Sequence, residues 1–226
     1  MAYENIINMD QLTFKFPFSK KYYEQDFFVS SNNFSAYKLI DSWPNWSGKW
    51  LNIFGESGSG KTHLSKILEK KIKKTKMINA VNIDNKTIEY LSNLDCLIIE
   101  NFKNNIDENL LYSILNQSKQ LDNFLLINSR ISIKHYDLKL VDLKSRLNSF
   151  VFIGIDLPND DLLRVVITKS LSDKQISISP KLSDYIINNV ERSYEKMFKV
   201  IKDLDELSLS TGKSININLI KKVLNK

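Results

Sequence analysis

The loop sequence GESGSGKT at residues 55–62 constrains what this chain can fold into more strongly than any other stretch. Four of its residues, Gly55, Gly60, Lys61 and Thr62, match the pattern G-x-x-x-x-G-K-[ST], which is found between a strand and a helix. The strand-like run KWLNIF precedes this loop, and the helical pattern THLSKILEKKIKK follows it. The context therefore favours a phosphate-binding loop over an ordinary Gly/Ser turn before a helix.

Strand-like runs and helical patterns alternate along most of the chain. After KWLNIF, the strand-like runs are KMINAV, DCLIIE, NFLLINS and FVFIGI, and helical patterns lie near Ile88, over 110–120 and up to Arg146. Such alternation predicts a parallel sheet flanked by helices. The unbroken apolar character of LIIE and FLLI indicates strands that are covered on both faces. We therefore expect an α/β fold.

Strand signals end at Pro158, and the sequence after it is typical of helices. Two acids at 160–161 suit a first helical turn, the Ser-Pro pair at 179–180 suits a helix start, and a long helical pattern covers 194–209. We expect a small helical lid and no further folded part after Lys226. The predicted parts are an arm over 1–20, an α/β nucleotide-binding domain over 21–157 and a lid over 158–226.

Composition excludes several classes of protein. With 42% hydrophobic and 26% charged residues, the chain is typical of a folded globular protein, not of a disordered or fibrous one. No apolar run is long enough to cross a bilayer, and the first residues lack the features of a signal peptide, so we expect a cytoplasmic protein without a membrane partner. The single cysteine, Cys96, cannot form an internal disulfide and is predicted to be buried. The net charge of +6 fits either an acidic partner or simply a lysine-rich composition.

The residue types of the loop and of one strand fit triphosphate chemistry. Lys61 can reach the outer phosphates, and the Thr62 hydroxyl can bind Mg²⁺. Asp95 and Glu100 compete for the magnesium side of the site, at opposite ends of the run DCLIIE. Ligands of parallel sheets lie beyond the carboxyl ends of strands, and a strand of this length separates the two acids by about 15 Å. We therefore predict that Glu100 is the magnesium-side residue.

Two asparagines bear on whether the chain hydrolyses its own nucleotide. Asn101 follows Glu100 and cannot take a proton from an attacking water, so we expect slow intrinsic hydrolysis. Asn128, in the run LLINSR, could hydrogen-bond a phosphate or that water. It could equally be a turn residue that ends a strand.

Four stretches together resemble the AAA+ module of the DnaA-related family: the loop GESGSGKTHL, the strand CLIIEN, KSRLNSF before a strand, and PNDDLLR at the start of the lid. Within that family, the chain resembles the short regulators called Hda. The stretches QLTFKF, DFFVSSNNFSAYKLIDSWPNW and VERSYEKM look like the alphaproteobacterial form of Hda. The resemblance covers nearly the whole chain, and it implies a nucleotide held between the α/β part and the lid.

The resemblance also implies a set of residues around ADP or ATP with Mg²⁺. In the loop, the implied nucleotide-binding residues are Gly55, Ser57, Gly58, Ser59, Gly60, Lys61, Thr62 and His63. Phe28 and Val29 would lie near the adenine, although core positions beside the sheet explain them equally well. Arg192 is the candidate for a lid arginine that touches the bound phosphate, but another alignment places Glu195 there and leaves Arg192 as a surface charge.

Arg146, in DLKSRLNSF, matches the position of the arginine finger that this family presents to the nucleotide of a neighbouring subunit. A guanidinium supplied in trans neutralises charge that develops on the transferred phosphoryl group. Without the resemblance, the favourable interaction of an arginine with a helix C-terminus would explain this residue. The predicted catalytic set is Arg146 in trans, with Glu100 and Asn128 in the chain's own site.

The segment QLTFKF near the start of the chain resembles the short motif by which replication proteins dock on the sliding clamp, the beta subunit of DNA polymerase III. An extended peptide with this spacing presents Leu12, Phe14 and Phe16 on one side, and Gln11 can anchor through its amide. An edge strand packed against the protein itself would show the same alternation. The position of the segment in the chain favours the clamp.

Taken together, the resemblance implies a regulator that stimulates ATP hydrolysis by DnaA on the DNA-loaded clamp and so switches replication initiation off. Because the sequence ends with the lid, we expect no sequence-specific DNA binding. Two alternatives stay open: an autonomous ATPase of the helicase-loader or remodelling type, and a clamp-bound adaptor without catalytic use of Arg146. The sequence also leaves open which nucleotide is preferred and whether a homodimer forms.

Overall fold

The computed structural model describes residues 24–103 and 106–225. These residues divide into two compact units, 24–158 and 159–225, and each unit is described by itself. The predicted arm at 1–20 lies outside the described residues.

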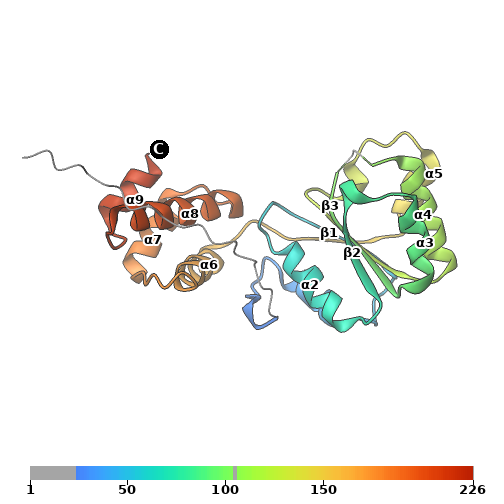
Figure 1. Cartoon of the computed structure of the whole chain (residues 1–226), viewed down its shortest axis with the longest axis horizontal. Helices are drawn as coiled ribbons and strands as arrows, with labels where there is room; N and C mark the ends of the chain where they lie inside the picture. The colour runs from blue at the N-terminus through green and yellow to red at the C-terminus, as the bar shows by residue number, and fades with distance from the viewer. Residues whose placement is uncertain (1–23, 104–105, 226) are drawn as a thin grey trace, which may run out of the picture. The chain divides into compact units, whose positions relative to one another are not determined.

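The first unit is built on a five-stranded sheet with the strand order β2-β3-β4-β1-β5 (Figure 1). Its strands are β1 (Trp50–Phe54), β2 (Thr75–Asn79), β3 (Cys96–Phe102), β4 (Phe124–Ser129) and β5 (Val151–Gly154). All neighbouring pairs are parallel. The predicted α/β class is therefore confirmed, and the loop after β1 leaves the sheet between the ends of β4 and β5.

Helices cover both faces of this sheet, because alternate strand residues enter two separate apolar cores. Leu51, Ile98 and Leu126 pack with the helices of one face, whereas Ile99 and Ile127 pack with those of the other. The first face carries α1 (Phe34–Asp41) and α2 (Lys61–Lys71), and the second carries α3 (Asn85–Tyr90), α4 (Glu108–Gln120) and α5 (Val141–Leu147) (Figure 1). Short 3-10 turns complete the unit: η1 (Glu24–Asp26), η2 (Ala80–Asn82), η3 (Leu91–Asn93) and η4 (Ile133–His135).

Two elements differ from their sequence-based predictions. The helix after the loop ends at Lys71, earlier than the pattern predicts, because Ile72 turns to extended backbone and is buried. Strand β3 continues past Glu100 to Phe102, with a shift in its pairing to β4 between Ile99 and Phe102. Asn101 lies in this irregular stretch, has a positive φ of 56° and is exposed. The irregularity breaks the regular pleat next to the site.

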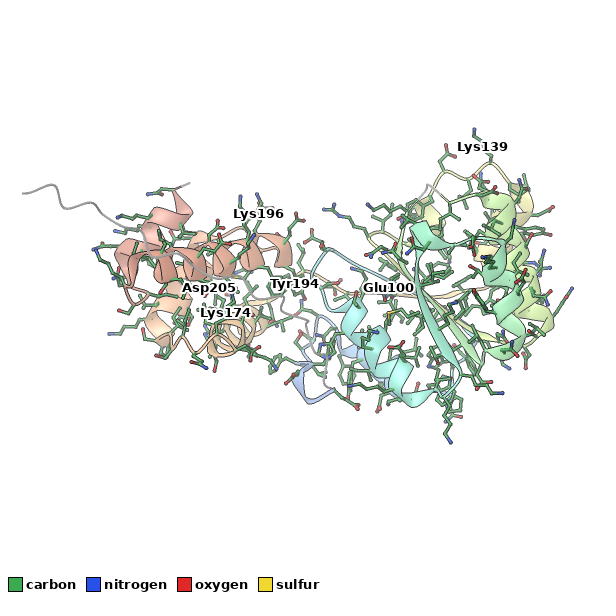
Figure 2. All side chains as sticks on the ribbon, in the orientation of Figure 1. Glu100, Lys139, Lys174, Tyr194, Lys196 and Asp205 are labelled. Atoms are coloured by element: carbon green, nitrogen blue, oxygen red, sulfur yellow. The ribbon has the colours of Figure 1, made fainter. Side chains whose placement is uncertain are left out.

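The second unit contains the helices α6 (Asp160–Ser172), α7 (Pro180–Asn189), α8 (Tyr194–Thr211) and α9 (Ile217–Leu224). Asn159, Ser193 and Asn216 begin three of them, each accepting a hydrogen bond from a backbone amide of the first turn. The four helices enclose their own apolar core, which includes Ile167, Leu204 and Ile220. At its surface Lys174 forms an ion pair with Asp205 (Figure 2). The predicted helical lid is present in the structure.

Candidate functional site

The loop after β1 has a backbone that only glycine adopts readily at its key positions. Gly55, Gly58 and Gly60 all have positive φ, and Gly60 is the N-cap residue immediately before α2. A Cβ on Gly60 would lie 2.9 Å from Cε2 of Phe27, and a Cβ on Gly55 would lie 2.8 Å from the backbone oxygen of Ile155. The glycines therefore allow the loop to curl tightly in front of the helix, where amides and the helix dipole favour anions.

The Lys61 ammonium lies inside this loop. Its Nζ donates to the backbone oxygens of Gly55 and Glu56, both at 2.7 Å, and lies 3.3 Å from the Oγ of Ser59. Burial lowers the pKa of Lys61 to about 8; the negative charge of Glu100 opposes this, and the positive charge of Arg130 adds to it. The side chain is thus a partly desolvated cation, which a phosphate group would favour strongly.

A buried network of polar side chains adjoins the loop. The Thr62 hydroxyl donates to Oε2 of Glu100 at 2.8 Å, and the Asn128 amide donates to Oε1 of the same carboxylate at 2.7 Å. That amide also donates to Oγ of Ser65 at 2.7 Å. Glu100 and Asn128 are only 6% and 1% exposed, so burial without these bonds would be costly. Strands β3 and β4 and helix α2 therefore hold the carboxylate, the amide and the hydroxyl in one place.

This oxygen-rich corner fits a magnesium nucleotide. Mg²⁺ prefers oxygen ligands and is usually held by one or two protein groups together with phosphates and water. Thr62 and Glu100 supply such groups, and no cluster of three or more metal-ligating acids, histidines or cysteines occurs among the residues that the structure describes. The Oδ1 atom of Asn128 is buried without a hydrogen-bond partner, which leaves one unused acceptor on this side chain.

The segment before α1 reaches the loop through Phe27. Its ring packs edge-on against His63, with centroids 5.3 Å apart, and stacks on Tyr37. Phe28 is 43% exposed and Val29 is partly buried. The predicted placement of Phe28 and Val29 near an adenine stays a prediction.

Arg146 lies in the last turn of α5, next to α4. Its Nε donates to Oδ1 of Asn116 at 2.9 Å, and the residue is partly buried. The carboxylate of Glu108, at the start of α4, accepts hydrogen bonds from the backbone amides of Lys139 and Leu140, just before α5. These amide bonds lower the pKa of Glu108. Helix α4 therefore fixes both the entry into α5 and the arginine near its end.

Arg192 belongs to the lid, where it forms an ion pair with Asp160 at 3.0 Å. The side chains of Arg192 and Asp160 are 64% and 44% exposed. Glu195 lies in the first turn of α8 and is exposed. Which of Arg192 and Glu195 corresponds to the lid sensor stays a prediction.

The sequence patterns do not predict three residues that contact the candidate site residues. Ser65 holds Asn128, Phe27 packs on Gly60, and Asn116 holds Arg146. Only Ser65 carries a usable signal, because it lies three residues after Thr62 and so on the same side of α2. The predicted clamp-binding residues Gln11, Leu12, Phe14 and Phe16 lie outside the described residues.

The fold and the loop define a class: a parallel α/β unit with a phosphate loop, followed by a helical lid, as in AAA+ proteins. Residues 160–224 match the family model described as the Hda lid domain. The chromosomal replication initiator DnaA of Buchnera aphidicola subsp. Cinara cedri is 26% identical over 235 residues, which cover 92% of this chain and 53% of that protein. The chain thus spans about half the length of this relative.

Solved structures show the same fold. Domain III of DnaA from Thermotoga maritima covers 93% of this chain and 98% of its own, with a TM-score of 0.76 and 18% identity. AMPPCP-bound DnaA from Aquifex aeolicus covers 86% of this chain and 68% of its own, with a TM-score of 0.69 and 18% identity. The chain is thus similar to Hda in its lid, to DnaA of Buchnera aphidicola in sequence, and to DnaA structures in fold. No helix among the described residues has both the length and the apolar character to span a membrane.

Proposed function

We propose that this chain is a nucleotide-bound regulator of chromosome replication initiation, which stimulates ATP hydrolysis by DnaA together with the DNA-loaded sliding clamp. The observation that carries the proposal is the match of residues 160–224 to the Hda lid domain, in a chain that also has a phosphate loop. An Hda-like protein with the DnaA fold is suited to dock on a second AAA+ module. Its target would then be DnaA.

In this proposal the chain's own nucleotide organises the molecule. The loop amides and Lys61 would bind the phosphates, and Thr62 with Glu100 would hold Mg²⁺, which neutralises phosphate charge when bound. Asn101 is exposed and has no group that accepts a proton, so a second carboxylate beside Glu100 is missing. Slow turnover and long nucleotide retention follow from this arrangement, with either ADP or ATP as the bound species.

Arg146 would act in trans, on the ATP held by DnaA. An arginine finger stabilises negative charge on the transferred phosphoryl group and is worth about three to five orders of magnitude in other NTPases. The hydrogen bond that Nε donates to Asn116 fixes the side chain at the end of α5, and a guanidinium has further donors for a phosphate. Preorganisation of this kind suits an arginine that must meet a partner's nucleotide.

The clamp would be bound by the segment from Gln11 to Phe16. Pull-down of the chain by immobilised clamp tests this part of the proposal. We expect the double variant Gln11→Ala, Leu12→Ala to lose clamp binding and to keep its bound nucleotide. Equal recovery of the double variant and the parent chain would contradict clamp docking through this segment.

Reconstitution tests the proposed activity. Purified DnaA loaded with radiolabelled ATP, clamp loaded on DNA and this chain are combined, and the conversion of DnaA-bound ATP to ADP is followed. We expect rapid conversion only when the clamp, DNA and the chain are all present. An unchanged DnaA-ATP level in the complete mixture would overturn the proposal, and with clamp and DnaA binding intact it would support an adaptor.

An autonomous ATPase is the second candidate, because the network of Thr62, Glu100 and Asn128 already places a carboxylate and an amide beside the loop. Steady-state turnover separates the two candidates. Several turnovers per second by the chain alone would favour the ATPase. Tight retention of nucleotide with negligible turnover would favour the regulator.

A further inference from the structure

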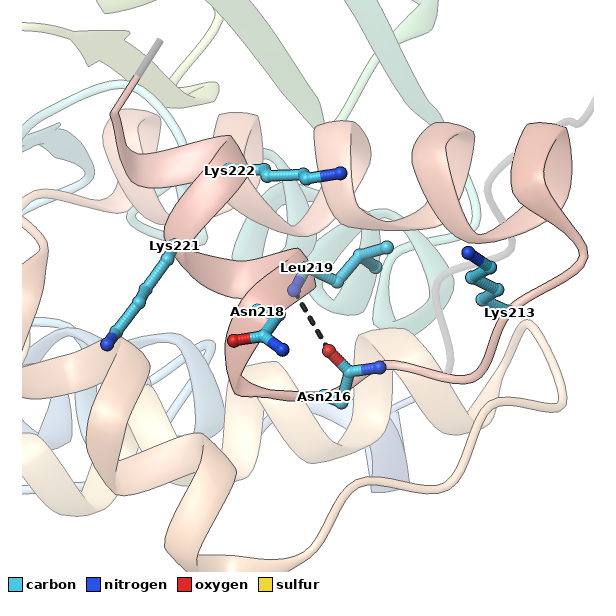
Figure 3. A pocket seen from close by; sticks show the side chains of 6 residues that line it. All are labelled: Lys213, Asn216, Asn218, Leu219, Lys221 and Lys222. Carbon is cyan, nitrogen blue, oxygen red and sulfur yellow. Dashed lines mark hydrogen bonds between the residues drawn. The ribbon is translucent and has the colours of Figure 1, made fainter.

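A basic pocket lies on the lid, beside α9. It has a volume of about 450 Å³ and is lined by Lys213, Asn216, Asn218, Leu219, Lys221 and Lys222 (Figure 3). Apart from Leu219, which belongs to the apolar core, all of these residues have amide or ammonium groups. None of the predicted nucleotide or clamp residues is among them. The pocket is therefore a separate feature of the lid.

The three pocket lysines come from α9 and from the segment that precedes it. Gly212 ends α8 with a positive φ of 62°, and the Ser208 hydroxyl bonds to the backbone oxygen of Lys213 at 2.7 Å. The chain then turns back into α9, and Figure 3 shows Lys213 on the segment before this helix, with Lys221 and Lys222 leaving the helix in different directions. Because α9 buries its apolar residues in the lid core, its lysines are left on the outside.

The charges of this pocket are not balanced within the chain. Residues 207–226 contain four lysines and no aspartate or glutamate. Among the residues that the structure describes, Lys213, Lys221 and Lys222 take part in no ion pair, unlike Lys174 and Arg192 of the same lid. Three lysines around one pocket give it a positive potential that attracts anions.

We propose that this pocket binds the phosphate backbone of DNA without sequence preference. Lysine ammonium groups on flexible stems neutralise phosphates, and Asn216 and Asn218 add amide donors that suit phosphate oxygens. A hollow lined by polar groups receives a protruding phosphodiester, whereas a bilayer surface would meet a convex basic face with apolar side chains around it. Such a site would contact no base edges, so binding should not depend on the DNA sequence.

Fluorescence anisotropy of the full chain with a short labelled duplex of arbitrary sequence tests the site. In the triple variant Lys213→Gln, Lys221→Gln, Lys222→Gln, we expect affinity at low salt to fall about tenfold or more. The plot of log affinity against log salt should lose about two to three units of slope, because each phosphate neutralised contributes about 0.9 for duplex DNA. A duplex of scrambled sequence should bind equally well.

A matched control removes the same charge from elsewhere on the lid. The variant Lys181→Gln, Lys199→Gln, Lys202→Gln changes three exposed lysines that do not line the pocket. It should keep the parent affinity and slope, and the triple replacement of the pocket lysines by arginine should also keep DNA binding. Circular dichroism melting of each variant shows whether the fold is retained.

Several outcomes would overturn the site. The first is that the parent chain shows no measurable binding of duplex, and the second is that the pocket and control variants lose DNA affinity equally. The third is that inorganic phosphate, at the concentration of the DNA phosphates, competes completely with the duplex. Binding of the pocket lysines to vesicles of anionic phosphatidylglycerol with no binding to duplex would assign the pocket to lipid instead. The test needs neither DnaA nor the clamp, so it fails or succeeds independently of the proposed function.

Discussion

The polar residues of the α/β unit and those of the lid are held in opposite ways. Glu100 and Asn128 are almost fully buried and hydrogen-bonded to each other, whereas Arg192 and Asp160 pair at the lid surface with side chains that are 64% and 44% exposed. Removing the hydrogen-bond partner of a buried polar group lowers the stability of the fold strongly, whereas an exposed ion pair contributes only about 0–1 kcal/mol to stability. The chemistry of the molecule should therefore be sensitive to the strand ends and tolerant at the lid surface.

The largest effect is expected from Glu100→Ala. This change leaves Thr62 and Asn128 without their shared acceptor, so the free energy of unfolding should fall by about 1–3 kcal/mol. Affinity for ATP should depend less on Mg²⁺, because one of the two proposed magnesium-side groups is removed. Urea unfolding and nucleotide titrations with and without Mg²⁺ measure both effects.

Glu100→Gln is the control, because it keeps the shape of the side chain and one acceptor oxygen. It should recover most of the stability and none of the magnesium dependence. Full magnesium dependence in both variants would remove Glu100 from the metal site and would make the buried network purely structural.

A smaller effect is expected from pH, through Lys61. The pKa of Lys61 is about 8 in the folded chain and 10.5 in the unfolded chain, so the folded state disfavours the charged form of this side chain. The unfolded chain binds more protons between these values, so the Lys61 contribution to stability rises as pH increases from about 8 to 10.5. Nucleotide affinity should do the reverse and fall above pH 8, by up to about tenfold per pH unit, since phosphates need the ammonium.

Nucleotide titrations across this range check the prediction, with Lys61→Arg as the control. The guanidinium stays charged, so the affinity of that variant should not change with pH. The same loss of affinity above pH 8 in both chains would show that another group is responsible.

Asn116→Ala tests the fixed arginine of α5 and should have a modest effect. Loss of one hydrogen bond to Nε should cost about 0.5–1.5 kcal/mol in stability and should slow the stimulation of DnaA several-fold. Asn116→Asp, which keeps the acceptor, should restore the stimulated rate. An alanine variant that is less stable but stimulates DnaA normally would reduce Asn116 to a packing residue.

The smallest effect is expected from Arg192→Ala. If Arg192 only pairs with Asp160 at the surface, stability should change by no more than about 1 kcal/mol and nucleotide affinity should not change. Thermal melting and nucleotide titration of the variant separate the two roles. A loss of nucleotide affinity larger than that of Glu195→Ala would make Arg192 the lid sensor and would break the contrast between the two regions.

The sequence predicts the parts of the fold whose signals are local. The glycine pattern, the apolar strands and the helix starts at Asp160 and Pro180 depend on neighbouring residues, and the structure has each of them. The placement of Glu100 at the carboxyl side of its strand follows from the rule for parallel sheets. Local patterns therefore predict the phosphate loop and one residue beside it, Glu100.

The contacts that complete the site depend on residues far apart in the chain. Asn128 and Ser65 are separated by 63 positions, and Arg146 and Asn116 by 30. No spacing rule predicts such pairs, because the sheet order and the packing of α4 on α5 decide them. The extension of β3 past Glu100 has the same origin, since its pairing with β4 resumes at Phe102.

The most direct test of the account is the rate at which DnaA-bound ATP is hydrolysed with Arg146→Ala in place of the parent chain. The measurement is made with clamp-loaded DNA, at concentrations where both chains occupy the clamp equally. We predict that the rate falls to the level seen without the chain, while the variant keeps its nucleotide and its fold. Stimulation by Arg146→Ala equal to that of the parent would contradict a catalytic guanidinium supplied in trans.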